Sequence, residues 1–129
     1  MLAANLDFVT YNSTGFAQDK RTFLESLLVS ADVLFVQEHW LTKGNLGELD
    51  KVGLNHLNTG ESGMPTGILR GRGRPYGGVA IYYSNEIAHN VEPLDPPATK
   101  DIVHVKMGNC HIINVYLPGD NYRQSCIDP

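Results

Sequence analysis

The fold of this chain is decided by residues 31–41, ADVLFVQEHWL. Residues 33–36 form an uninterrupted apolar run, which is typical of a strand covered on both faces. Before it, apolar residues at i, i+4 spacing predict a helix over residues 17–30, and the alternating residues 6–11 predict a strand. The order strand, helix, buried strand predicts a right-handed βαβ unit with two parallel strands.

A polar residue follows each of these two strands. Asn12 comes after the first strand and Glu38 after the second, so both should emerge at the same edge of the sheet. A carboxylate fixed at a strand end suits Mg²⁺, which adds waters and phosphate oxygens to one or two carboxylates. Residues 31–41 alone fit equally well a surface glutamate that opens a loop. Asn12 alone is better explained by turn geometry than by a role with phosphate.

The rest of the chain predicts antiparallel strands. Seven of the 13 glycines fall within residues 55–78, which predicts a long mobile loop and not a helix. Residues 79–83 resume strand character, and residues 87–91 are their expected partner. Residues 102–106 and 110–116 alternate with period two and predict a hairpin. One helix on such strands predicts an α/β (α+β) layer with one sheet face poorly covered.

Two further side chains near the predicted edge call for interpretation. Tyr116 ends the last predicted strand, where its hydroxyl can donate a hydrogen bond to a phosphate oxygen as charge develops. In isolation, an aromatic side chain that seals the sheet margin is the simpler explanation. His39 is expected to be structural, because successive residues of a strand point to opposite sides and His39 follows Glu38 directly.

Composition restricts the class of protein. With 129 residues, a net charge of −4 and a pI near 5.6, the chain fits one compact domain that does not hold nucleic acid by bulk charge. Arg70, Arg72 and Arg74 can contact a nucleic-acid backbone locally, although a solvated loop is the favoured explanation for them. Cys110 and Cys126 fit neither a zinc site nor a disulfide framework, so no disulfide-linked partner is expected.

Targeting signals are not recognisable in the sequence. The first residues lack the basic and apolar regions of a signal peptide, and no apolar run is long enough to span a membrane. We therefore expect no membrane partner and an intracellular location, nuclear or cytoplasmic, for a protein that is not secreted.

Four motifs together resemble a known family. Four segments occur along the chain in the order typical of the endonuclease/exonuclease/phosphatase superfamily: Tyr11-Asn12, residues 32–38, the GGVAI of residues 77–81 and the NVYLP of residues 114–118. More narrowly, the pattern from about residue 6 to residue 118 is similar to endonuclease domains of non-LTR retrotransposons and related animal sequences. The Gln-Glu pair at residues 37–38 is the most specific of the four motifs.

The resemblance implies a fold, a reaction and roles for single residues. The fold would be a partial two-sheet α/β sandwich, about the N-terminal half of one apparently truncated domain that spans residues 1–129. The reaction would be hydrolysis of a phosphodiester with Mg²⁺ or Mn²⁺, and the partner would be DNA, cut by a retroelement endonuclease in the full-length parent. Glu38 would bind the metal, Asn12 would organise metal and phosphate, and Tyr116 would lie by the scissile phosphate.

The sequence also departs from the family pattern. Thr14 stands where some members carry an acidic residue, and the later Asp-x-Asn and Asp-His motifs do not occur in the chain. We therefore expect the isolated chain not to cleave DNA, and whether it is an enzyme by itself stays open. Two alternatives remain: a phosphatase or sphingomyelinase-like phosphodiesterase of the same superfamily, or a decayed fragment without catalytic activity.

Overall fold

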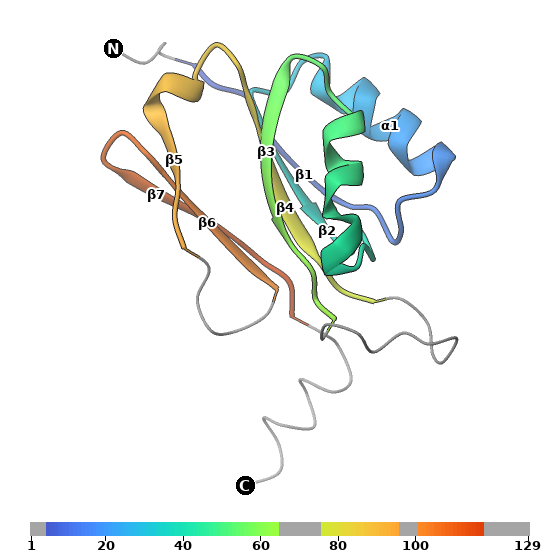
Figure 1. The fold of residues 1–129 in the computed structure, drawn as a ribbon. Helices are drawn as coiled ribbons and strands as arrows, with labels where there is room; N and C mark the ends of the chain where they lie inside the picture. Colours follow the sequence, from blue (N-terminus) through green and yellow to red (C-terminus); the bar gives the residue numbers. More distant parts are fainter. Residues whose placement is uncertain (1–4, 65–75, 96–100, 118–129) are drawn as a thin grey trace, which may run out of the picture.

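The computed structural model describes residues 5–64, 76–95 and 101–117 as two sheets packed face to face (Figure 1). In chain order the elements are β1 (Phe8–Asn12), α1 (Gln18–Leu28), β2 (Val33–Gln37), the 3₁₀ helix η1 (Lys43–Lys51), β3 (His56–Glu61), β4 (Val79–Ser84), the short 3₁₀ helix η2 (Ala88–Asn90), β5 (Val91–Pro93), β6 (Ile102–Met107) and β7 (Cys110–Val115). This two-sheet arrangement with few helices confirms the predicted α/β (α+β) fold class.

The first sheet has the strand order β1-β2-β4-β3. Strands β1 and β2 are parallel and are joined through α1, which confirms the predicted βαβ unit. Their register pairs Asn12 with Gln37, so Glu38 leaves the sheet directly beside Asn12. Strand β4 lies antiparallel between β2 and β3.

The core lies on both faces of the first sheet. Every residue of β4 from Val79 to Tyr83 is buried, because α1 and η1 cover one face and β5–β7 cover the other (Figure 1). Leu24 and Leu28 of α1 pack on the helix side with Leu34 and Val36 of β2. On the other side, alternate residues of β6 pack against the first sheet, namely Val103, Val105 and Met107. The bare apolar run of β2 is therefore explained by burial on both faces.

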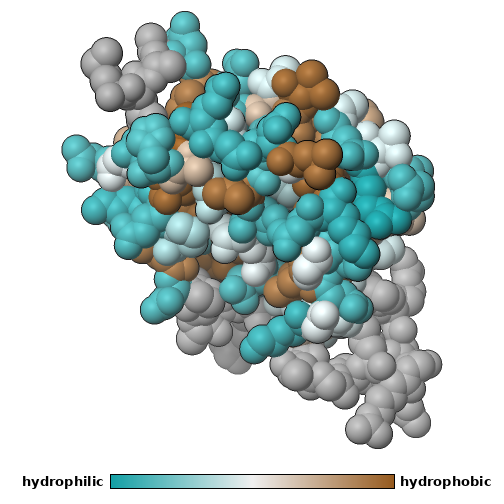
Figure 2. Space-filling model, turned by 45° about the horizontal axis from the view of Figure 1, so that its top comes forward, coloured by the Kyte–Doolittle hydropathy of each residue, from teal (hydrophilic) through white to brown (hydrophobic). Residues whose placement is uncertain are grey.

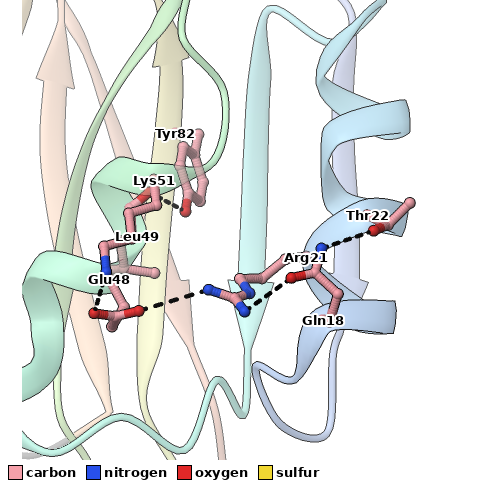
Figure 3. Close-up of polar contacts among 7 residues, drawn as sticks. All are labelled: Gln18, Arg21, Thr22, Glu48, Leu49, Lys51 and Tyr82. Carbon is pink, nitrogen blue, oxygen red and sulfur yellow. Dashed lines mark hydrogen bonds and ion pairs between the residues drawn. The ribbon is translucent and has the colours of Figure 1, made fainter.

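The helix layer is tied together by polar contacts (Figure 3). Glu48 of η1 lies 3.6 Å from an Arg21 nitrogen on α1 and 2.9 Å from Lys51. Ion pairs at the surface contribute little. The buried contact matters more: the Tyr82 hydroxyl donates to the Leu49 carbonyl at 2.8 Å and so joins η1 to β4.

The second sheet has the strand order β5-β6-β7 and is antiparallel throughout. Strands β6 and β7 form the predicted hairpin, with Met107 paired to Cys110 across a two-residue turn. Gly108 has φ +59°, the left-handed conformation that such tight hairpin turns require. Figure 1 shows α1 and η1 on the side of the first sheet that faces away from β5–β7.

Two predictions about this region are wrong. Residues 56–61 belong to β3, not to a loop, and they are the partner of β4. Residues 87–91 do not pair with β4, because they contain η2 and the start of β5 in the other sheet. Strand β3, HLNTGE, is polar and only partly buried at the sheet edge, so neither alternation nor β-branched residues mark it. Residues 65–75 of the predicted loop lie outside the described part.

The surface view in Figure 2 shows a mostly hydrophilic face on which apolar side chains stand in small separate groups. Isolated exposed apolar residues of this kind are normal for a folded protein. In the described ranges no helix has the length and apolar character needed to cross a membrane.

Candidate active site

Asn12 and Glu38 are in direct contact at the carboxyl ends of β1 and β2. The Asn12 side-chain nitrogen donates to Glu38 Oε2 at 2.5 Å. The Asn12 side-chain oxygen accepts from the Thr14 backbone N–H at 3.1 Å, which is an Asx turn. Asn12 therefore both forms the turn and contacts Glu38, because the turn directs its amide nitrogen towards the Glu38 carboxylate.

The backbone of Glu38 is held in an uncommon conformation. Its φ is +59°, a left-handed conformation that few residues other than glycine adopt. The Glu38 N–H donates to the Gly78 carbonyl at 2.7 Å, and its carbonyl accepts from the Gly15 N–H at 2.8 Å and the Ser13 hydroxyl at 3.2 Å. Backbone strain of this kind persists only where neighbouring bonds enforce it, and it is frequent at functional sites.

Tyr116 reaches the same carboxylate from the second sheet. Its hydroxyl is hydrogen-bonded to the Glu38 side chain. The pKa of Tyr116 is raised by burial first, then by the negative charges of Glu38 and Asp101, and by that hydrogen bond. The phenol is therefore protonated at neutral pH and donates to Glu38. The structure thus brings Asn12, Glu38 and Tyr116 together from three strands and two sheets.

Asp101 is a part of this region that the sequence did not single out. It is buried, and its Oδ1 accepts from the Gly78 N–H at 2.7 Å. Its backbone carbonyl accepts from the Tyr116 N–H at 3.0 Å. Because Gly78 also binds Glu38, an unbroken series of hydrogen bonds runs from Glu38 through Gly78 and Asp101 to Tyr116. Asp101 precedes β6 without any local motif, so only its tertiary contacts indicate this role.

Asn114 joins the two sheets behind the site. The side-chain nitrogen of this buried β7 residue donates to the Val36 and Ala80 carbonyls at 3.0 and 2.8 Å. Its side-chain oxygen accepts from the Gln37 amide at 2.8 Å. Sequence reasoning placed Asn114 in a motif but assigned it no task. In the structure it sets the spacing of β7 against β2, and so the approach of Tyr116 to Glu38.

Solved structures with a similar fold are known. The chain superposes on an AP endonuclease from Archaeoglobus fulgidus with a TM-score of 0.60 at 19% identity, over 88% of this chain and 42% of that one. A 3′ phosphatase NExo from Neisseria, bound to a product DNA hairpin, gives 0.60 at 18% identity, over 88% and 42%. The 3′-5′ exonuclease NExo from Neisseria meningitidis gives 0.57 at 17% identity, over 90% and 46%.

The chain therefore shares the fold of these solved nucleases and phosphatases. This chain spans less than half the length of the solved structures that it matches. Neither protein-family models nor curated protein sequences give a match to the chain.

The metal donors that this site offers are oxygen atoms. Glu38 offers a carboxylate at the sheet edge, and Asn12 Oδ1 keeps a second lone pair beside its bond to Thr14. Hard oxygen donors of this kind fit Mg²⁺ or Mn²⁺, which retain several waters. Across residues 5–64, 76–95 and 101–117, no three acidic, histidine or cysteine side chains gather as a metal-binding group. Arg70, Arg72 and Arg74 lie outside the described residues.

His39 supports this edge of the first sheet as a buried neutral side chain. Its Nδ1 accepts from the Leu41 N–H at 3.0 Å, so the ring proton sits on Nε2 and is donated to the Glu61 carbonyl at 3.0 Å. Burial lowers the pKa of His39 to about 4. With both ring nitrogens bonded to backbone, His39 is structural, as its position in the sequence indicated.

We expect the folded protein to lose stability as the pH falls, because of His39. Its pKa is near 6.5 when unfolded and about 4 when folded, so the stabilisation is complete above pH 6.5 and is lost towards pH 4. Urea unfolding should give a free energy lower by about 2 kcal/mol at pH 5 than at pH 7.5 from this residue alone. Histidine NMR titration identifies the source, and a His39 ring that titrates near pH 6.5 would contradict the assignment.

Proposed function

We propose that this chain carries the metal-holding half of a phosphodiester-cleaving site, which acts on DNA as a retroelement-type endonuclease in a longer parent protein. The observation that supports the proposal is the convergence of Asn12 and Tyr116 on the Glu38 carboxylate. Two neutral donors on one carboxylate orient it without cancelling its charge, which is what a cation ligand needs.

Each of the three residues has a task in this proposal. Glu38 would bind Mg²⁺ or Mn²⁺ through the lone pairs of its carboxylate oxygens that do not accept a hydrogen bond. The bound ion would supply positive charge at a phosphate oxygen. Asn12 would fix the Glu38 rotamer, and its carbonyl oxygen would accept a hydrogen bond from a water molecule. Tyr116, kept protonated by its raised pKa, would donate to a phosphate oxygen when substrate displaces its bond to Glu38.

DNA is the substrate that the comparisons and the sequence favour together. One neighbour in the structural comparison is bound to a DNA hairpin. The sequence pattern resembles retroelement endonucleases, and Arg70, Arg72 and Arg74 add local positive charge to an acidic chain. Glu38 and Asn12 would serve a phosphatase or sphingomyelinase-like phosphodiesterase equally well, so the assay must include such substrates.

We also propose that the isolated chain binds metal weakly and does not turn over. Hydrolysis needs a base for the attacking water and further ligands beyond one carboxylate. In the described part of the chain Glu38 belongs to no group of three or more acidic, histidine or cysteine side chains that could hold a metal ion.

Metal binding tests the proposal on the chain as it stands. Titration with Mn²⁺, followed by its EPR signal, should show one weak site that Glu38→Gln weakens at least about tenfold. Glu25→Gln, on the exposed face of α1, is the matched control and should bind like the unaltered chain. Equal Mn²⁺ affinity in the unaltered chain and in Glu38→Gln would refute the metal role.

Activity is tested on the same preparations with supercoiled DNA, 3′-phosphorylated DNA and inositol phosphates in Mg²⁺. The isolated chain should leave all three unchanged, whereas the longer parent should nick the supercoiled DNA and lose that activity in Glu38→Gln. Clear Mg²⁺-dependent nicking by the isolated chain would refute its proposed inactivity. Cleavage of inositol phosphates alone by the parent would assign the site to a phosphatase.

A further inference from the structure

Two histidines meet on the outer face of the β6–β7 hairpin, on the side away from the first sheet. His104 of β6 and His111 of β7 alternate with the buried residues of their strands, so both project outward. The Nε2 of His104 lies 2.8 Å from the Nδ1 of His111, and the ring centroids are 4.9 Å apart. The two histidines are seven positions apart, a spacing that conceals this contact in the sequence, since only the hairpin register makes them diagonal neighbours.

The backbone fixes the separation of the two rings. Strands β6 and β7 pair in register along their whole length, from Ile102 with Val115 to Met107 with Cys110. His104 is directly opposite Ile113, and His111 is directly opposite Lys106. Because both histidines lie within paired strands and not in a loop, little conformational entropy is lost when a ligand bridges them.

The distance between the nitrogens selects a class of ligand. Imidazole nitrogens lie roughly 2.0–2.1 Å from a bound metal. Two such nitrogens are therefore about 2.8–3.0 Å apart when the nitrogen–metal–nitrogen angle is 90°, and about 3.3–3.4 Å apart when that angle is tetrahedral. The observed 2.8 Å matches the right angle, which is the geometry of square-planar or tetragonal sites for Cu²⁺ and Ni²⁺. We propose that His104 and His111 form a two-imidazole site for such a divalent transition metal on the outer face of the second sheet.

The protonation of the pair is compatible with this ligand. One ring nitrogen donates and the other accepts, and the tautomers decide which ring is the donor. For both nitrogens to bind one metal ion, the donating ring must carry its proton on its other nitrogen, and both rings must turn by roughly 45° so that their lone pairs meet at a point off the line between the nitrogens. Lys106 is the nearest cation in the register, and Glu92 of β5 is directly opposite it and offsets its charge. Water completes the coordination on the exposed side.

This site is chemically distinct from the one at Glu38. Imidazole nitrogens prefer Cu²⁺ and Ni²⁺, whereas the carboxylate and amide oxygens at the sheet edge prefer Mg²⁺ and Mn²⁺. The inference therefore does not depend on the proposed function, and the two can be tested separately.

Ni²⁺ is the suitable probe, because thiols do not reduce it. Calorimetric titration of the chain at pH 7.5 should show one site, and His104→Ala and His111→Ala should each weaken it at least about tenfold. His89→Ala removes another exposed histidine and is the matched control; it should leave the affinity unchanged. X-ray absorption of the loaded protein should show two imidazole ligands, and 5 mM Mg²⁺ should not compete.

Three results would overturn the inference. Unchanged Ni²⁺ affinity in both alanine variants would show that the histidines are not ligands. An equal loss in His89→Ala would indicate nonspecific binding to surface histidines, and a loss in Cys110→Ser would assign the metal to the exposed thiol. His104→Ala and His111→Ala should also keep the Mn²⁺ affinity of the unaltered chain, and circular dichroism of both confirms the fold.

Discussion

Gly78→Ala is expected to lose at least about 4 kcal/mol of unfolding free energy, a large share of the total stability of a domain. A Cβ at this position would overlap the His39 ring, with Nε2 at 2.8 Å and other ring atoms closer. The ring cannot move aside, because the Leu41 N–H and the Glu61 carbonyl hold both of its nitrogens. The φ of Gly78, +97°, is also a conformation that alanine adopts only with strain.

The effect should extend to the candidate site. Gly78 donates to Asp101 and accepts from the Glu38 N–H, so any shift of its backbone moves both neighbours of the site. If a fraction of Gly78→Ala folds, its Mn²⁺ affinity should fall with its stability.

Urea unfolding and the soluble yield measure this prediction. Gly44→Ala is the matched control, since Gly44 lies in η1 with open space around its Cα. Alanine should leave its stability unchanged or raise it by up to about 1 kcal/mol. A Gly78→Ala protein within about 1 kcal/mol of the unaltered chain would contradict the packing described for His39.

Asn114→Ala is expected to cost about 3 kcal/mol, the second largest effect. The substitution removes the donor shared by the Val36 and Ala80 carbonyls and leaves one Gln37 N–H without its acceptor. These groups lie between the two sheets, where lost hydrogen bonds are not replaced by water at low cost. Chemical unfolding measures the loss, and Asn45→Ala, at an exposed position of η1, is the control that should change little.

Asn114→Asp separates the hydrogen bonds from simple packing. The carboxylate has nearly the same shape but would place a negative oxygen against the two carbonyls in place of the donating nitrogen. It should therefore be at least as destabilising as alanine at pH 7 and recover partly in acid. A stable Asn114→Asp protein would show that the polar contacts between the sheets carry little of the stability.

Local pattern was sufficient for the elements with strong periodicity. The parallel pair β1–β2, helix α1 and the β6–β7 hairpin follow from apolar spacing and a glycine-containing turn, and all three are present. Strand β3 was missed because a polar edge strand is stabilised by backbone pairing with β4, which leaves no mark in its side chains. For the same reason residues 87–91 were wrongly paired with β4.

Part of the candidate site could likewise be predicted from the sequence, and part of it only from the structure. The sequence by itself determined that Asn12 and Glu38 lie at one sheet edge, because parallel strands joined through a helix end on the same side. Only the tertiary structure decided that Asp101 and Gly78 connect Glu38 to Tyr116, that Asn114 joins the sheets, and that His104 meets His111. The physical reason is range: periodicity and turn chemistry act within a few residues, whereas these contacts depend on how two sheets pack and register.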